Sequence, residues 1–379
     1  MSKRPAFGTP LHVGRPNIGD KAAFLARVED MFDRRWLSND GPCLQEFEEW
    51  MAEFLGVRHF IAVCNGTVGL EIMAKACGLV GEVIMPAFTF VATAHAMQWV
   101  GATPVFCDVD PRTHNIDPSL VEHLITDETT GILGVHVWGR PCDVEALEAI
   151  ARRNGLVLVF DAAHALGCTH GGRMIGNFGV AECFSFHATK FFNTFEGGAI
   201  TTNDDEVANR CRLMRNFGFD GPDNVVSVGT NGKMSEVSAA MGLTNLESMA
   251  SFTDTNARNY RAYAAGLDGI PGIELIEYSE SDRCNCQYVV IEIDETWSGL
   301  SRDELQAQLT ADNVLARRYF YPGCHLMKPY ASEPLRAQLP ETERLASRTL
   351  SLPTGTAVDE RDIQAVCRLI GDAVNAARG

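Results

Sequence analysis

Short runs of β-branched and other apolar residues alternate with helical patterns between residues 55 and 205. Several runs are apolar at every position, which is typical of strands in a sheet that helices cover on both faces. The intervening stretches are amphipathic, as in 143–153, where Val144 and Leu147 repeat at helical spacing. We therefore predict a large layered α/β domain with a mostly parallel sheet. Its seven strands are expected at residues 60–63, 82–85, 104–109, 131–136, 156–161, 182–186 and 198–202.

The pattern changes after a long helical stretch near residues 235–266. Strands are then expected at 273–278, 287–293 and 316–321, and helices at 302–312 and 359–377. This mixture predicts a smaller α+β domain at the C-terminus. We place the boundary so that residues 1–250 form the large domain with an N-terminal arm and residues 251–379 form the small domain.

The composition fits a globular protein and argues against some partners. The chain has 379 residues, and 46% of them are hydrophobic, which is enough to form a substantial core. Its formal net charge of −17 argues against nucleic acid or an anionic membrane as a partner. No apolar run approaches the ~20 residues that span a bilayer, and the N-terminus lacks the apolar segment of a signal peptide. We therefore expect a cytoplasmic protein.

The twelve cysteines are scattered, and most of them lie within apolar stretches. The one close pair, Cys284 and Cys286, has no neighbouring cluster of Cys or His that could complete a zinc site. We expect no metal site and interpret the cysteines as buried, reduced thiols.

Two segments directly follow predicted strands, where open α/β sheets bind their ligands. Gly66, Thr67 and Val68 begin an apolar helix just after the first strand. N–H groups at a helix start, a glycine that permits close approach and a threonine hydroxyl favour a phosphate site, although such a turn is more often a plain connection. Phe90 follows the next strand and could either stack on a flat heterocycle or belong to the core.

Two further segments at strand ends carry ionisable side chains. Asp161 ends the most hydrophobic strand, and His164 follows it. A carboxylate there is costly to bury without a cation, and a protonated pyridine nitrogen would be such a cation; a helix cap or a metal ligand is the alternative. Lys190 comes five residues after Ser185, so it can turn back into a cleft, where burial would lower its pKa toward the nucleophilic range. The alternative for this lysine is a solvated surface position.

The four features together are the parts of a pyridoxal 5′-phosphate (PLP) site. They supply a phosphate cradle, an aromatic ring for stacking, a carboxylate for the ring nitrogen and a lysine for a Schiff base. We therefore predict a PLP enzyme in which Lys190 holds the cofactor.

Seven segments form an ordered pattern along the chain, at residues 65–67, 86–93, 115–118, 136–141, 161–164, 185–190 and 231–235. In this order they resemble the DegT/DnrJ/EryC1/StrS family of sugar aminotransferases. The resemblance covers nearly the whole chain, from Asn39 to the final helix. It implies the aspartate aminotransferase-like fold of fold-type I PLP enzymes.

The resemblance also implies a role for each matching residue. Lys190 would form the internal aldimine, Asp161 would pair with the pyridinium nitrogen, and His164 would lie beside the ring. Phe90 would stack on the ring. The phosphate would be held by Gly66, Thr67, Val68 and Ser185, and by Asn231 from the partner subunit. Sites shared in this way imply a homodimer.

The usual reaction of this family implies L-glutamate as amino donor and a nucleotide-linked keto-sugar as acceptor. The presence of His164 favours amination at C4, so the expected conversion is dTDP-4-keto-6-deoxy-D-glucose to dTDP-4-amino-4,6-dideoxy-D-glucose. Glu196, Tyr321 and His325 are the expected contacts to the sugar nucleotide. The basic, aromatic segment 317–321 could meet the pyrophosphate and base, or form a strand with a solvated edge.

Four alternative functions remain: amination at C3, a PLP-dependent sugar dehydratase, a non-catalytic regulator on the same fold, and an NAD enzyme. Dehydratases of the family replace the Schiff-base lysine, which is intact here as Lys190. A regulator is disfavoured because every expected cofactor contact is present. A Rossmann NAD enzyme would need a Gly-x-Gly-x-x-Gly turn after its first strand, which this sequence lacks.

Overall fold

The largest sheet contains the seven strands that the sequence pattern predicts. The computed structural model describes residues 4–379. The strands are β2 (His59–Val63), β3 (Glu82–Pro86), β4 (Thr103–Cys107), β5 (Thr129–Val135), β6 (Val157–Asp161), β9 (Ala181–Ser185) and β10 (Gly198–Thr202). Their order is β2-β10-β9-β6-β5-β3-β4. Within this sheet β10 runs antiparallel to both neighbours, and the other pairings are parallel.

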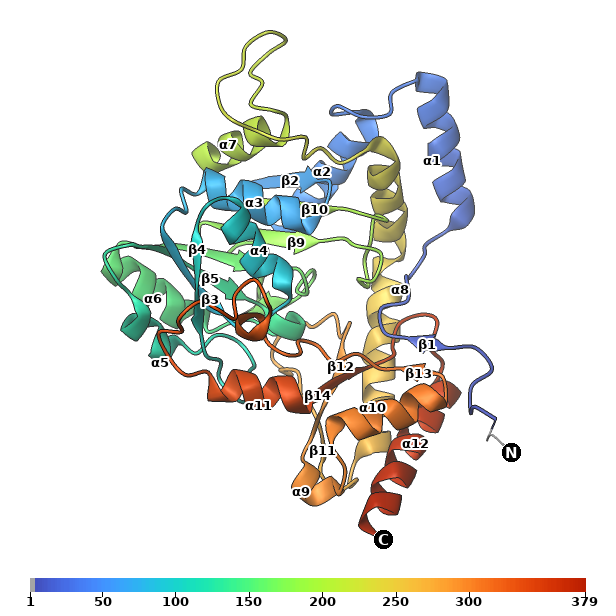
Figure 1. Cartoon of the computed structure of the whole chain (residues 1–379). Coiled ribbons are helices and arrows are strands. Elements are labelled where there is room, and N and C mark those ends of the chain that lie inside the picture. The colour runs from blue at the N-terminus through green and yellow to red at the C-terminus, as the bar shows by residue number, and fades with distance from the viewer. Residues whose placement is uncertain (1–3) are drawn as a thin grey trace.

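Helices cover both faces of this sheet, as its apolar strands require (Figure 1). One face is covered by α2 (Pro42–Leu55), α6 (Val144–Asn154) and α8 (Glu236–Leu267), and the other by α3 (Gly66–Ala76), α4 (Val91–Trp99) and α7 (Asp205–Arg215). Within β2, Phe60 and Ala62 join the first core, whereas Ile61 and Val63 join the second. This alternation follows because successive side chains of a strand point to opposite faces.

A smaller sheet lies in the C-terminal part of the chain. Strands β11 (Ile273–Leu275), β12 (Val289–Ile293) and β14 (Thr349–Leu352) pair antiparallel in the order β11-β12-β14. Their core is closed by α10 (Arg302–Ala311), α12 (Glu360–Arg378) and the C-terminal half of α8. The remaining elements are β1 (Leu11–His12), α1 (Lys21–Arg34), α5 (Pro118–Val121), η1 (Glu122–Leu124), η2 (Val137–Gly139), β7 (Thr169–His170), β8 (Arg173–Met174), α9 (Glu295–Ser298), β13 (Val314–Leu315), η3 (Cys324–Leu326) and α11 (Pro340–Arg348).

Helix α8 connects the two parts of the molecule, as Figure 1 shows. It continues without interruption through residue 250, so its first half packs in the core of the large sheet and its second half in the core of the small sheet. The N-terminal arm packs against the C-terminal part of the chain, where β1 pairs parallel with β13. The domain division at residue 250 stays a prediction, and one helix is common to both sides of it.

The predicted strand at residues 316–321 is wrong. Strand β13 ends at Leu315, and the residues after it form an irregular loop, called here the 316–321 loop. Its pairing with β14 is limited to one isolated bridge from Arg317 to Ser351.

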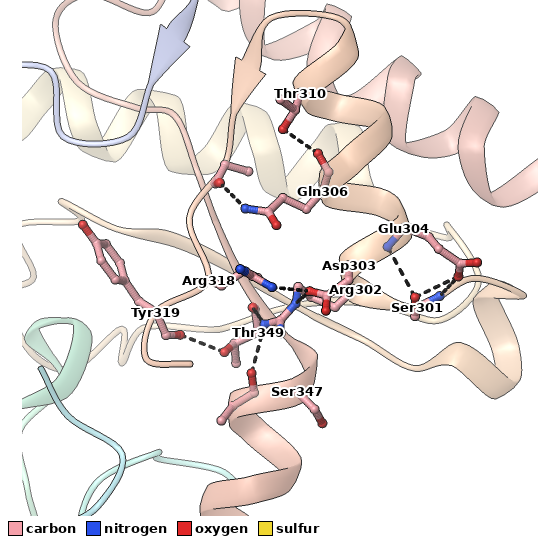
Figure 2. Close-up of polar contacts among 12 residues, drawn as sticks. Ser301, Arg302, Asp303, Glu304, Gln306, Thr310, Arg318, Tyr319, Ser347 and Thr349 are labelled. Atoms are coloured by element: carbon pink, nitrogen blue, oxygen red, sulfur yellow. Dashed lines mark hydrogen bonds and ion pairs between the residues drawn. The ribbon is translucent and has the colours of Figure 1, made fainter. Parts of the chain in front are cut away.

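Side chains from neighbouring elements hold the 316–321 loop in its irregular path. Gln306 Nε2 donates to the carbonyl of Ala316 at 3.0 Å. Thr349 Oγ1 donates to the carbonyl of Tyr319 at 2.9 Å. Figure 2 shows Gln306 and Thr349 directed at this loop from α10 and β14. Because side chains satisfy these carbonyls, the loop does not need a partner strand.

A buried glutamate joins α2 to α8. Gly41 precedes α2 and has no side chain to cap the first N–H groups of that helix. Glu236, the first residue of α8, accepts from Cys43 N at 3.0 Å and from Leu44 N at 2.9 Å instead. The residue is 1% exposed, so water cannot replace it as the acceptor.

Replacing Glu236 with alanine should lower the free energy of unfolding by about 2–5 kcal/mol, because two buried N–H groups lose a charged acceptor. Glu247→Ala is the matched control, since Glu247 lies on the same helix and pairs with Arg27 near the surface. The control should cost no more than about 1 kcal/mol. Urea unfolding followed by circular dichroism measures both variants. Equal losses in the two would contradict the capping role of Glu236.

Candidate functional site

A cavity of about 570 Å³ lies where β5, β6 and β9 end. It is lined by residues of all four predicted segments: Gly66, Thr67, Val68, Phe90, Asp161, His164, Ser185 and Lys190. The C-terminal part of the chain supplies Tyr288, Arg317, Tyr319 and Phe320. Segments that are far apart in the sequence meet here because parallel strands end at the same edge of the sheet.

The start of α3 forms one side of the cavity. The first N–H groups of a helix have no acceptor within the helix, and Gly66 and Thr67 stand at these positions. The N–H of Val68 is engaged, since it donates to Asn65 Oδ1 at 2.9 Å. Gly66 also permits close packing, because a Cβ there would lie 3.0 Å from the Cβ of Ser185. This helix start is therefore suited to an anion such as phosphate.

Asp161 is buried at the end of β6. Its Oδ2 accepts from Thr93 Oγ1 at 2.8 Å, and its Oδ1 accepts from Ala163 N at 3.0 Å. Burial raises the pKa of this carboxyl, and the two hydrogen bonds and the charge of Lys190 oppose that rise. A cation beside Asp161 would favour its ionised form. The sequence pattern did not single out Thr93. The one sequence feature that could have marked it is a second threonine, Thr89, four residues earlier; the two hydroxyls lie 2.9 Å apart in the structure.

Lys190 lies on the loop that follows β9. Its Nζ is 3.3 Å from the Tyr288 hydroxyl. Burial lowers the pKa of Lys190 to about 8, and the charge of Asp161 limits the decrease. An ordinary lysine has a pKa of about 10.4, so much more of Lys190 is unprotonated near neutral pH. That is the form in which an amine acts as a nucleophile. No local motif marks Tyr288 in the sequence.

His164 is buried in an aromatic cluster. Its ring is nearly parallel to those of Trp138 and Phe320, with centroid distances of 6.2 and 5.9 Å. Its Nδ1 accepts from Trp138 N at 3.3 Å. Burial, together with the charge of Lys190, lowers the pKa of His164 well below its usual range. The imidazole is therefore neutral, and its proton is on Nε2.

Phe90 and Glu196 lie on the exposed side of the cavity. Phe90 immediately precedes α4, and 55% of its surface is exposed. Glu196 is exposed as well, with its carboxylate 3.5 Å from His187 Nε2. Both side chains are thus accessible to a molecule that enters the cavity.

Tyr321, His325 and Asn231 do not line the cavity. Tyr321 lines an adjoining groove of about 380 Å³ that also contains Phe90 and Arg317. His325 is 2% exposed in η3 and lies outside both the cavity and this groove. Asn231 is exposed on the segment between α7 and α8.

Within residues 4–379, no group of three or more His, Cys, Asp or Glu side chains is arranged to hold a metal ion. In the same range, no helix combines the length and the apolar character needed to cross a membrane. The cysteines, including Cys284 and Cys286, are free thiols.

Known proteins similar to this chain include sugar aminotransferases. The sequence profile of the DegT/DnrJ/EryC1/StrS aminotransferase family matches residues 19–371. A dTDP-4-amino-4,6-dideoxy-D-glucose transaminase of Shigella dysenteriae is 39% identical over 344 residues, which is 91% of this chain and 94% of the relative. A transaminase of the same name from Escherichia coli is 35% identical over 94% of this chain and 97% of its own length.

A solved structure with the same fold was obtained for DesI in the presence of its TDP-sugar product. It is 50% identical to this chain, covers 99% of it and 95% of DesI, and has a TM-score of 0.95. These matches confirm three predictions: the family, the fold-type I architecture and the enzyme class, sugar aminotransferase.

In the cofactor-free protein, Lys190 should react with acetic anhydride as an amine whose pKa is about 8. Because only the free base reacts, its labelling should be half-maximal near that pH, roughly two pH units below an ordinary lysine. Competitive labelling against Nα-acetyl-lysine, quantified by mass spectrometry, measures this midpoint. A midpoint equal to that of the reference compound would contradict the effect of burial.

Proposed function

We propose that this chain, which belongs to the DegT/DnrJ/EryC1/StrS aminotransferase family, uses PLP to transfer the amino group of L-glutamate to C4 of a nucleotide-linked keto-sugar. The expected reaction converts dTDP-4-keto-6-deoxy-D-glucose to dTDP-4-amino-4,6-dideoxy-D-glucose. The observation that carries the proposal is the meeting of Lys190, Asp161 and the start of α3 in one cavity. The two transaminase relatives, and DesI with its TDP-sugar product, support the choice of substrate.

The residues of the cavity fit PLP. Gly66 and Thr67 at the helix start, together with the Ser185 hydroxyl, suit the phosphate. Asp161 suits a protonated ring nitrogen, and the amine of Lys190 suits the aldehyde. When bound, PLP supplies an electron sink for the negative charge that develops on the α-carbon of the amino donor.

Lys190 is the group best suited to move the proton in this reaction. With a pKa of about 8, its Nζ can accept the proton from the donor α-carbon and return one at physiological pH. Asp161 would remain ionised beside a ring cation, because an opposite charge offsets the effect of burial on its pKa. His164 is neutral, so it would not place a second positive charge in the cavity that competes with the ring cation for Asp161.

The groove beside the cavity suits the nucleotide part of the substrate. Arg317 lines this groove and lies over the ring of Tyr319 at 5.5 Å, and among residues 4–379 no carboxylate forms an ion pair with it. Arg318 pairs with Asp303 at 3.2 Å and lies over the ring of Tyr321 at 4.8 Å. The unpaired guanidinium suits a pyrophosphate. The half-exposed Tyr321 ring suits stacking with the base.

The reaction can be tested directly. The purified protein with PLP, L-glutamate and dTDP-4-keto-6-deoxy-D-glucose should produce 2-oxoglutarate and a sugar that NMR identifies as aminated at C4. Lys190→Ala should remain folded and lose at least about a hundredfold in turnover, because the proton-transfer group is gone.

Parallel reactions with a GDP-linked 4-keto-sugar and a dTDP-linked 3-keto-sugar control for nucleotide and position. Faster amination of either control sugar would replace the assigned substrate. No amination of any sugar in the panel would refute the proposed reaction.

We further propose that the active unit is a homodimer with shared sites. Asn231 is exposed and outside the cavity of its own chain, as expected for a residue that serves a partner. Exposed apolar side chains surround it in sequence or lie on α1: Leu25, Phe32, Phe217, Phe219, Val225, Val226 and Val228. Such side chains are typical of association surfaces. A two-fold interface is self-complementary, so both sites would form together.

Mixing two inactive variants tests this arrangement. Lys190→Ala removes the lysine, and Asn231→Asp places a negative charge against the phosphate of the partner's site. A heterodimer then carries one site with both changes and one with neither, so random exchange should restore up to about a quarter of native activity. Each variant alone must be nearly inactive, and mass spectrometry must show that subunits exchange. Absence of recovery after exchange would mean that Asn231 serves its own chain.

A further inference from the structure

We propose that the hydroxyl of Tyr288 positions the amine of Lys190 whenever that amine is not bonded to the cofactor. The inference rests on the proposed PLP chemistry and adds a residue from outside the large sheet to the site. Tyr288 immediately precedes β12 and is 98 positions from Lys190 in the sequence. Its hydroxyl is the one hydrogen-bond partner of Lys190 Nζ that the described residues provide, at 3.3 Å.

The Tyr288 side chain is held firmly in place. Its ring centroid lies 4.7 Å from that of His164 and 5.4 Å from that of Trp138. Its backbone carbonyl accepts from the Tyr278 hydroxyl at 2.7 Å, and the same hydroxyl lies 3.2 Å from the carbonyl of Trp138, with which it shares its single proton. The phenol oxygen therefore has a fixed location, against which a flexible lysine side chain can be held.

The electrostatics of the pair suit a holding role. Burial raises the pKa of Tyr288, so the phenol is neutral at physiological pH. A neutral hydroxyl can accept from the ammonium form of Lys190 and donate to its free base. An ionised carboxylate at this place would instead raise the pKa of the lysine, and an apolar group would leave the buried amine without a partner.

A transamination cycle requires such a contact to hold the released lysine. Lys190 must leave the cofactor, move a proton and then return to the same carbon atom. A lysine side chain has many rotamers, and a released Lys190 would regain them. A hydrogen bond from a fixed phenol restricts those rotamers and keeps Nζ close to the reacting atoms.

Tyr288→Phe tests the inference, because it removes the hydroxyl and keeps the ring that packs on His164. Cofactor-free protein is mixed with PLP, and the covalent capture by Lys190 is followed by its yellow absorbance. Capture should slow about tenfold or more, which is the usual effect of losing a hydrogen bond to a charged or reacting group. Pyridoxamine phosphate has no aldehyde and forms no Schiff base with Lys190, so its affinity should change no more than about twofold.

Tyr263→Phe is the matched control. It removes another buried tyrosine hydroxyl, which donates to the carbonyl of Pro353 at 2.9 Å in the core of the small sheet and does not line the cavity, so capture should stay close to the native rate. As a second probe, 3-fluorotyrosine at position 288 keeps the shape of the ring and lowers the pKa of the phenol. The more acidic hydroxyl accepts less well from the ammonium form of Lys190 and donates better to its free base, so the pH midpoint of capture should move to lower pH.

Each outcome separates this inference from the proposed function. If native protein does not capture PLP on Lys190, the proposed function itself fails. If native protein captures PLP and Tyr288→Phe does so at the same rate, the positioning role is overturned. Equal losses of capture and of pyridoxamine phosphate affinity would also overturn it, because they would show a purely structural role. An unchanged pH profile with 3-fluorotyrosine would count against the inference even if Tyr288→Phe failed to fold.

Discussion

The burial of charge at the end of β6 is the constraint on which this site depends. Asp161 lies in an apolar layer, where an ionised carboxylate is stable only with donors and a cation around it. Thr93 and the N–H of Ala163 supply the donors, and burial still raises the pKa of the carboxyl. The cavity therefore favours a cationic group next to Asp161, which a protonated pyridine ring would provide.

The same burial shifts the pKa values of the other ionisable groups of the cavity. Desolvation disfavours whichever form is charged, so it lowers the pKa of Lys190 and of His164 and raises that of Tyr288. One physical effect thus yields an amine with a much larger free-base fraction than an ordinary lysine, a neutral imidazole and a neutral phenol side by side. These are the protonation states that nucleophilic attack and proton transfer by a lysine require.

The fold fixes the position of the two parts of the chain that form the cavity. The large sheet and the loop after β9 supply Asp161 and Lys190, and the C-terminal part of the chain supplies Tyr288 and the 316–321 loop. Helix α8 packs in both cores, and Glu236 at its start caps α2. A continuous helix in both cores leaves little freedom for one wall to move against the other, and positioning within the site depends on that rigidity.

The sequence alone determined the seven large-sheet strands and the four segments at their ends, because side-chain alternation and strand-end polarity are local signals. It also predicted Asp161 and Lys190 as site residues, and both line the cavity. Only the tertiary structure decided the contact of Tyr288 with Lys190, the cap from Glu236 and the irregular 316–321 loop. Each of these joins residues that are distant in sequence, or replaces strand pairing by side-chain hydrogen bonds. Periodicity cannot reveal such contacts, because it reports which face of an element is buried and not which residue lies against it.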